Sequence, residues 1–459
     1  MKAVAAGHPA TADAGMEILD EGGSAADAAV AASLASCVAE TVMTGLLGGG
    51  HAIHFDAASG RTANLDFFIA IPGLGRERRE VTLLELEVPF GAELVHYAVG
   101  IASCGVPGVA AGLDALWSAH GRLPWSRLVE PALRLARGAV PMPAAHASCL
   151  RMLEVVMTMN EGARIYAPGG SLLEEGDLLR QPGLVPVLEA LAAEGPRSPY
   201  EGTIGRALLQ LMDDGGGLVT DDDLCGYHAT WSEPVALEFR GVTLRTRAGL
   251  SDLPSALATL PELRGLGESE RALAVVGALA GGIPAQNGTT NLAVLDDDGN
   301  ACVVTTSLGL GSGDFVPGLD LHLNSMLGEA DLLTGPLEPG QRMASMMAPT
   351  LALDENGVAL AAGAAGGTRL RSALLQVVAG VLDEGLDLQA AVDRPRLHPV
   401  GSLVHVEHGF SPETIGALES AGLEVREWPG RHHYFGGVSG VTRTGCAGDP
   451  RRSGAARAS

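Results

Sequence analysis

The feature of this sequence that most constrains its fold is a change of pattern near residue 281. Before that point the spacing of apolar residues is mostly helical, apart from a strand predicted at Ala52–Phe55. After it the spacing is that of paired strands, until a helix returns. The helical part contains three predicted segments: Ala12–Asp20 behind a Thr11 N-cap, an alanine-rich helix behind Ser24 with Asp27 as its capping acid, and a block over Pro107–Arg137 that a turn at 121–124 interrupts.

The strand-rich part predicts two hairpins and then a helix. The hairpins pair Thr290–Leu295 with Ala301–Ser307, and Thr350–Leu353 with Val358–Ala362 through an Asn356-Gly357 turn. The helix covers Leu370–Leu382, and the small, polar tail from Gly445 to Ser459 is predicted to be disordered. Strands between two groups of helices indicate a layered α/β (α+β) architecture, in which sheets pack between helices.

Charge and composition exclude several classes of partner and cofactor. The formal net charge is −24, which argues against binding to nucleic acid or to an anionic membrane. Lys2 is the only lysine, so the chain has no P-loop lysine and no lysine for a Schiff base, and we predict no cofactor. Six dispersed cysteines without a C-x-x-C pair, and no apolar stretch of about 18 residues, predict a soluble cytoplasmic protein.

Other motifs give weaker signals. The glycine runs at 45–50 and 309–313 are not followed by the helix and acid of a dinucleotide site. His405 and His408 lie in a strand-like stretch that would point them to opposite faces, which disfavours a shared metal. The G-x-S-x-G motif of the α/β-hydrolases is absent.

The segment Asn287-Gly288-Thr289-Thr290-Asn291 opens the strand-rich part and allows two interpretations. It can be an ordinary strand entry, or it can carry a nucleophile. A threonine hydroxyl becomes a nucleophile when its own α-amine is free to act as the base, and a free α-amine titrates near neutral pH. Thr289 would reach that state by a cut after Gly288, a residue that crowds the attacked carbonyl least.

The chain resembles the γ-glutamyltranspeptidase family of self-cleaving N-terminal-nucleophile hydrolases, and the resemblance covers almost all of it. The matching stretches occur in order along the chain: His8-Pro9, Ala14-Gly15, Ile18-Leu19, 22–31, Gly48-Gly49-Gly50, Val106-Pro107-Gly108, 121–125, 217–220, Gly288-Thr289-Thr290 and 365–369. The resemblance implies a four-layer αββα fold and cleavage between Gly288 and Thr289. The pieces 1–288 and 289–459 would stay associated as one folded unit.

The resemblance also implies catalytic roles. Thr289 is the nucleophile, and Ser307 matches the hydroxyl residue that hydrogen-bonds its amine. Gly366 and Gly367 match the pair whose backbone N–H groups form the oxyanion hole, in agreement with two glycines placed just before a helix. Asn291 stands where the family continues with histidine.

Several positions that bind a glutamyl group in the family are changed. Ser345 matches one of two serines that hold the α-carboxylate, whereas Met346 replaces the other. Phe68 stands in place of an arginine, and phenylalanine cannot imitate a bidentate arginine. Leu327 and Gly328 stand where an acid should receive the α-amine, and Gly309 replaces another polar contact. Losing both charge partners should cost several kcal/mol of glutamyl binding.

These observations predict a self-processing amidohydrolase that transfers an acyl group to water or to an amine, with a donor other than a standard γ-glutamyl compound. Glutathione hydrolysis would require Glu329, Asp331 or Arg369 to replace the missing contacts. Two alternatives stay open. One is a C–C bond-cleaving relative in bacterial antibiotic (alkylproline) biosynthesis, and the other is an uncleaved, non-catalytic binding protein.

Overall fold

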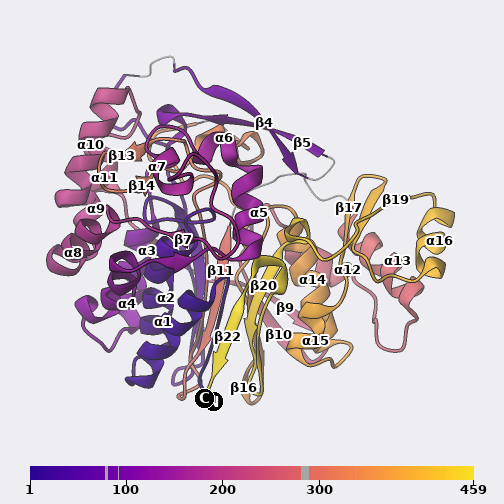
Figure 1. The fold of residues 1–459 in the computed structure, drawn as a ribbon. Helices are drawn as coiled ribbons and strands as arrows, with labels where there is room; N and C mark the ends of the chain where they lie inside the picture. The colour runs from indigo at the N-terminus through magenta and orange to yellow at the C-terminus, as the bar shows by residue number, and fades with distance from the viewer. Residues whose placement is uncertain (78–80, 91–92, 281–288, 336) are drawn as a thin grey trace.

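The computed structural model describes residues 1–77, 81–90, 93–280, 289–335 and 337–459. Two β-sheets face each other in the middle of the molecule, and helices cover the outer face of each sheet (Figure 1). The layered architecture expected from the sequence, and the αββα order of layers implied by the family resemblance, are therefore confirmed.

The first sheet has seven strands, and every neighbouring pair is antiparallel. In spatial order they are β22 (Ala455–Ala458), β1 (Ala3–Ala6), β11 (Thr290–Leu295), β12 (Ala301–Ser307), β2 (Gly49–Asp56), β3 (Arg61–Phe67) and β8 (Thr230–Ser232). The helices on its side are α1 (Pro9–Asp20), α2 (Ala25–Ala39), α3 (Val109–His120), α4 (Trp125–Arg137), α8 (Leu184–Glu194), α9 (Ser198–Glu201), α10 (Thr203–Gly215) and α11 (Asp221–Gly226).

The second sheet has six strands, again antiparallel throughout. Their spatial order is β21 (Cys446–Gly448), β20 (Gly437–Val441), β16 (Gly357–Ala365), β15 (Thr350–Asp354), β10 (Val242–Thr246) and β9 (Val235–Phe239). The helices on this side are α12 (Leu253–Thr259), α13 (Glu268–Leu279), α14 (Arg369–Leu382), α15 (Leu388–Asp393) and α16 (Pro412–Ser420).

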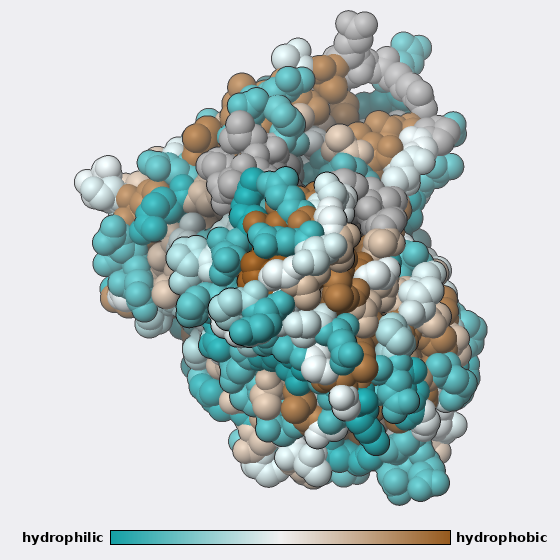
Figure 2. All heavy atoms as spheres, turned by 90° about the vertical axis from the view of Figure 1, so that its right-hand side faces the viewer, coloured by the Kyte–Doolittle hydropathy of each residue, from teal (hydrophilic) through white to brown (hydrophobic). Residues whose placement is uncertain are grey.

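Smaller elements surround the two sheets. They are the strands β4 (Leu84–Phe90), β5 (Glu93–Val99), β6 (Val140–Pro141), β7 (Leu178–Leu179), β13 (Phe315–Val316), β14 (Leu321–His322), β17 (Leu397–Val400), β18 (Leu403–Val406) and β19 (Glu424–Glu427), and the helices α5 (Ala144–Met152), α6 (Glu154–Met157) and α7 (Gly162–Tyr166). Figure 2 shows the face on the right-hand side of Figure 1, where hydrophilic residues are mixed with smaller hydrophobic areas. Among the described helices, none has the length and apolar character needed to cross a membrane.

The layer between the sheets consists of small and branched apolar side chains. From the first sheet, β11 contributes Ala293 and Leu295, and β12 contributes Ala301 and Val303. Their neighbours in sequence, such as Leu292 and Val304, pack against the helices instead. Because side chains alternate along a strand, the odd-numbered residues of β11 and β12 face the second sheet and the even-numbered residues face α2.

Most predicted elements are confirmed with small shifts of their bounds. The Ser24 cap of α2 is a complete capping box, in which Asp27 N donates to Ser24 Oγ (3.1 Å) and Ser24 N donates to Asp27 Oδ2 (3.0 Å). Both predicted hairpins are present, as β11–β12 and β15–β16. Gly357 takes φ +97° in the second turn, a conformation that glycine adopts at low cost.

The predicted Thr11 N-cap is wrong. Helix α1 begins at Pro9, and its N-cap is His8, whose Nδ1 accepts a hydrogen bond from Ala10 N (3.0 Å). Thr11 lies inside the helix and donates its hydroxyl to the Glu40 carboxylate (2.6 Å). The helix starts earlier than expected because proline fits its first position without losing a backbone hydrogen bond.

The C-terminal segment overturns the prediction of a disordered tail. Residues 446–448 form β21, and β22 pairs with β1 at the edge of the first sheet. Arg451 and Arg452, which looked like parts of a polar tail, are only 3% and 7% exposed. The composition of the segment does not predict that it is ordered. Most of the carboxylates and backbone carbonyls that the buried arginines contact come from distant parts of the chain.

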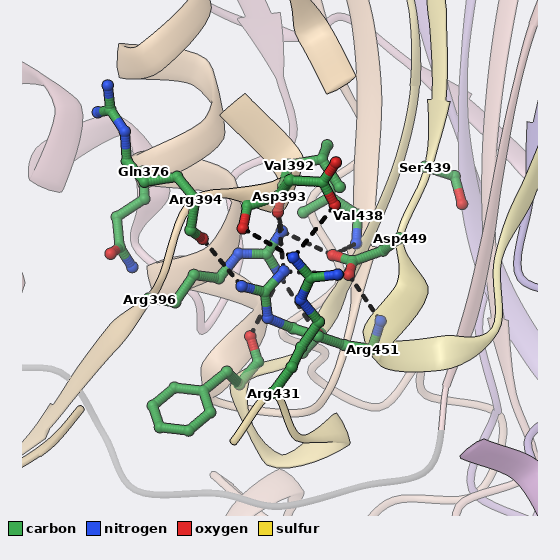
Figure 3. Close-up of polar contacts among 12 residues, drawn as sticks. Gln376, Val392, Asp393, Arg394, Arg396, Arg431, Val438, Ser439, Asp449 and Arg451 are labelled. Carbon is green, nitrogen blue, oxygen red and sulfur yellow. Dashed lines mark hydrogen bonds and ion pairs between the residues drawn. The ribbon is translucent and has the colours of Figure 1, made fainter. Parts of the chain in front are cut away.

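A buried cluster of charges holds this segment in place (Figure 3). Arg396 and Arg451 contact the two carboxylate oxygens of Asp449 at 2.6 and 3.2 Å. Arg451 Nε also donates to Glu407 Oε1 (2.8 Å), and Val438 N in β20 donates to Asp449 (2.9 Å). Burial alone would raise the pKa of Asp449, but the two arginines lower it below its usual value.

We expect Asp449→Asn to lower the free energy of unfolding by about 3 kcal/mol, because it removes the carboxylate paired with the buried Arg396 and leaves Arg451 with Glu407 alone. Denaturant unfolding followed by circular dichroism measures this change. Asp354→Asn is the matched control, because it breaks the partly exposed Arg443–Asp354 pair (2.6 Å) and should cost less than about 1 kcal/mol. Equal losses in the two variants would contradict a special role for the buried cluster.

Candidate active site

Thr289 lies directly before β11 and is buried, with 4% of its surface exposed. By the alternation of β11, Thr289 is on the face toward the second sheet, whereas Thr290 is on the face toward α2. Gly288, the other half of the predicted cleavage site, lies outside the described residues. The structure therefore places the predicted nucleophile at the end of the layer between the two sheets.

The strand register places Ser307 and Phe68 in one row with Thr289. Thr290 pairs with Thr306, so the next positions along the two strands, Thr289 and Ser307, are opposite each other. Ser307 in turn pairs with Gly49. Gly50 pairs with Phe67, so the next positions along these two antiparallel strands, Gly49 and Phe68, lie opposite each other. Ser307 Oγ accepts a hydrogen bond from Gly309 N (2.8 Å). Two predicted catalytic residues and one predicted substrate residue thus come together across the sheet.

Asn291 connects the two sheets next to this row. Its Oδ1 accepts a hydrogen bond from Thr305 Oγ1 (2.8 Å), and its Nδ2 donates to Ser439 O in β20 (3.2 Å). A Cβ atom on Gly363 of β16 would lie 1.9 Å from Asn291 Oδ1, so glycine is required for this close approach. Where the resemblance expects histidine, asparagine fixes the distance between β11 and the second sheet.

Gly366 and Gly367 follow β16 directly and precede α14. Both are buried, with φ +131° and φ +60°. Within the described part of the chain, neither N–H has a hydrogen-bond acceptor, although both carbonyls accept bonds from the start of α14. Buried N–H groups are almost always paired, so two adjacent unpaired donors are suited to receive an oxygen that carries negative charge. Ala365, the preceding residue, lines one cavity together with Thr289.

This small cavity is lined by several charged or titratable groups. Glu40, His146, Asp449 and Arg452 all line it. Burial lowers the pKa of His146 to about 3, with smaller contributions from His8 and Arg452. Burial raises the pKa of Glu40 to about 7, although hydrogen bonds from two threonines oppose the change.

Glu40 is a residue of this cavity that the sequence alone does not predict. It directly follows α2, is 1% exposed, and accepts the hydroxyl hydrogens of Thr11 and Thr290. The available signal was an acid at the C-terminal end of a helix, where the helix dipole disfavours a negative charge. Such a residue needs a compensating contact, and here the contact includes the residue next to the predicted nucleophile.

Two of the changed substrate positions lie in one apolar cluster. Phe68 and Met346 are both buried, and they pack with Ile69, Met326, Met343 and Met347. The Phe68 ring also stacks on His51 at a centroid distance of 5.5 Å, and burial keeps the pKa of His51 well below its usual value. The two positions at which polar glutamyl contacts are lost are thus joined by apolar packing.

Ser345 and Gly328 also make contacts that fix them. Ser345 is buried; its Oγ accepts a hydrogen bond from Met347 N (3.2 Å), and its carbonyl accepts one from Arg247 (3.1 Å). Gly328 packs against β5 so closely that a Cβ atom would lie 1.6 Å from Ala98 O. No side chain fits at position 328 without movement of β5.

A different acid lies beside Gly309. A Cβ atom on Gly309 would be 2.4 Å from Glu329 Oε1, so the buried Glu329 carboxylate occupies the space that a larger residue at 309 would need. Burial raises the pKa of Tyr97 well above its usual range, Glu329 raises it further and Arg369 lowers it. Asp331 raises it as well, so all three charged residues considered as replacements for the glutamyl contacts lie near one tyrosine of β5.

Comparison with known proteins identifies the family of the chain. The family model described as gamma-glutamyltranspeptidase matches residues 11–276 and 269–459. The Acylase ACY 1 proenzyme of Pseudomonas sp. (strain SE83) is 29% identical, with 95% of this chain and 89% of that protein covered. The glutathione hydrolase proenzyme of Escherichia coli (strain K12) is 28% identical, with 90% and 83% covered.

Solved structures agree at the level of the fold. A cephalosporin acylase from Bacillus halodurans superimposes with a TM-score of 0.82 at 23% identity, over 99% of this chain and 95% of that one. The whole chain thus has the fold of an N-terminal-nucleophile hydrolase, and its named relatives are hydrolases. This chain belongs to the γ-glutamyltranspeptidase family.

Proposed function

We propose that this protein is a self-processing amidohydrolase in which Thr289 is the nucleophile. A cut before Thr289 frees its α-amine, which then takes the proton of the hydroxyl as Oγ attacks the amide carbon of an acyl donor. In this proposal Ser307, which the register puts opposite Thr289, orients that amine. Water or an amine then releases the acyl group and restores the threonine.

Gly366 and Gly367 stabilise the charged intermediate in this proposal. Their N–H groups are buried and have no other acceptor among the described residues, so no hydrogen bond has to break when a negatively charged oxygen forms. This property supports an oxyanion hole at these two glycines.

The two pieces are expected to stay together after cleavage. The first sheet combines β1, β2, β3 and β8 from residues 1–288 with β11, β12 and β22 from residues 289–459. The second sheet likewise combines β9 and β10 with strands of the later piece. Separating the pieces would therefore expose both sheets and the apolar layer between them.

The donor is proposed to carry an apolar acyl group instead of a γ-glutamyl group. The observation that carries this proposal is the apolar cluster of Phe68 and Met346, at the positions where the family holds the glutamyl carboxylate. Burying a carboxylate against these side chains without a charge partner would cost several kcal/mol. The chain is about as similar to a named acylase as to a named glutathione hydrolase, so its relatives are not all named for glutathione.

A panel of chromogenic anilides tests the donor. We expect kcat/KM for butyryl, hexanoyl or phenylacetyl p-nitroanilide to exceed that for γ-glutamyl p-nitroanilide by at least about tenfold, the equivalent of 1.4 kcal/mol. Phe68→Ala removes the largest apolar contact and should reduce this preference. Preference for the γ-glutamyl donor would contradict the proposal, and turnover of no anilide by cleaved protein would favour the C–C bond-cleaving alternative.

A further inference from the structure

Self-cleavage needs a proton acceptor that the proposed turnover mechanism does not provide. Before cleavage, the nitrogen of Thr289 belongs to the peptide bond with Gly288, and an amide nitrogen is not basic. The α-amine that serves as the base in turnover therefore does not yet exist. Another group near Thr289 has to accept the hydroxyl proton during the first cut.

The cavity beside Thr289 offers four titratable or charged side chains, and three are poorly suited to the task. Arg452 is a permanent cation, and its side chain has no atom that can accept a proton. Asp449 is bound by Arg396 and Arg451, which keep its pKa low and its oxygens occupied. His146 is buried in a position that disfavours its protonated form.

Glu40 is the fourth group, and its contacts connect it to the nucleophile. Its carboxylate accepts the Thr290 hydroxyl, and Thr290 is bonded directly to Thr289. Gly7 packs directly against both side chains. A Cβ atom on Gly7 would lie 2.4 Å from Glu40 Oε2 and 2.7 Å from Thr290 Oγ1. Cys37, in the last turn of α2, stays a neutral thiol because burial, and then Glu40, raise its pKa to about 12.

We propose that Glu40 is the proton carrier of self-cleavage, an inference that rests on the proposed cut before Thr289. Thr289 Oγ adds to the carbonyl carbon of residue 288, and its proton passes to the Glu40 carboxylate across the cavity that both residues line. Glu40 returns the proton to the Thr289 nitrogen as the C–N bond breaks, which leaves an ester. Water then hydrolyses the ester, giving a carboxylate on residue 288 and a free hydroxyl and amine on Thr289.

The environment of Glu40 gives this step a defined pH dependence. Burial brings the pKa of Glu40 to about 7, and the ionised form is the proton acceptor, so the rate of self-cleavage should rise through neutral pH and then level off. The Thr11 hydroxyl lowers this pKa, because it donates a hydrogen bond to the carboxylate. Thr11→Val should therefore move the midpoint of the pH profile upward.

The test measures the rate of self-cleavage. The uncleaved precursor is made by cell-free synthesis and transferred to buffers from about pH 5 to 9, and samples are analysed by denaturing gel and intact mass. We expect Glu40→Gln to slow self-cleavage by at least about 100-fold and to remove its dependence on pH. Glu40→Asp, which keeps a carboxylate, should recover part of the rate. Asp314→Asn is the control, because burial also raises the pKa of Asp314 but this residue does not line the cavity.

The outcomes separate this inference from the proposed function. Wild-type protein that cleaves, together with Glu40→Gln protein that cleaves at the same rate, would overturn the role of Glu40 alone. Wild-type protein that never cleaves would overturn both proposals. Should Glu40→Gln fail to fold, Thr11→Val decides, since an unchanged midpoint would contradict a proton carrier at Glu40.

Discussion

Thr289→Ala is expected to leave the protein as one chain of 459 residues and to reduce amide hydrolysis by at least about 10⁴-fold. The substitution removes the hydroxyl that attacks both the peptide bond before it and the acyl donor, and no other described hydroxyl has the same position at the start of β11. Intact mass of wild-type protein should show pieces of 288 and 459 − 288 = 171 residues. The variant should show neither.

Thr289→Ser is the matched control, because serine keeps the attacking hydroxyl and, after cleavage, the α-amine. We expect this variant to cleave and to hydrolyse donors at a reduced rate. Thr289→Ala protein that is cut at the same bond would show that another group performs the cut. Wild-type protein that stays whole would favour the uncleaved, non-catalytic alternative.

Local patterns were sufficient to predict the part of the site that lies on neighbouring strands. The β11–β12 hairpin is indicated by its turn and by its apolar residues, and antiparallel pairing then places Thr289 opposite Ser307. The glycine pair before α14 is likewise a local signal. The family resemblance assigned roles to these residues, and the strand register shows that they can act together.

Contacts between distant segments could not be predicted in this way. Glu40 becomes part of the site only because α2 packs under β11, and Arg452 only because the C-terminal segment returns to β1 and β20. The small, polar residues of the tail satisfy the compositional rule for disorder. That rule does not account for buried ion pairs such as Arg396–Asp449, whose partners are 53 residues apart (449 − 396).

At the changed substrate positions, the surrounding packing decides whether the polar residue of the family could be introduced by substitution. At Gly328 an acid would collide with the backbone of β5, whereas Glu329 already places a carboxylate beside Gly309. At Phe68 and Met346 an arginine would have to replace side chains that pack with Met326, Met343 and Met347, so its guanidinium would be buried against apolar groups. The loss of the glutamyl contacts is therefore built into the packing of several segments, and single reversions should not recover γ-glutamyl specificity.

Gly366→Ala is expected to lower kcat by about 10²–10³-fold with a smaller change in KM, the effect of losing one oxyanion-hole donor. At φ +131° an alanine is strained, and its Cβ would lie 2.8 Å from Gly436 Cα, so the backbone has to move. That movement turns the N–H groups of residues 366 and 367 away from the oxygen that becomes negatively charged. Steady-state kinetics with the best anilide of the panel measures the loss.

Gly357→Ala separates the loss of this donor from the general cost of placing alanine at positive φ. Gly357 has φ +97° in the β15–β16 turn, at the opposite end of β16 from Gly366, and a Cβ atom there meets nothing within 4 Å. The control should lower stability by about 1 kcal/mol and leave kcat unchanged, because the strain stays in an open turn. If the two variants lose activity to the same extent, backbone strain in β16 explains the loss. If only Gly366→Ala loses activity, the N–H groups at the end of β16 stabilise the transition state.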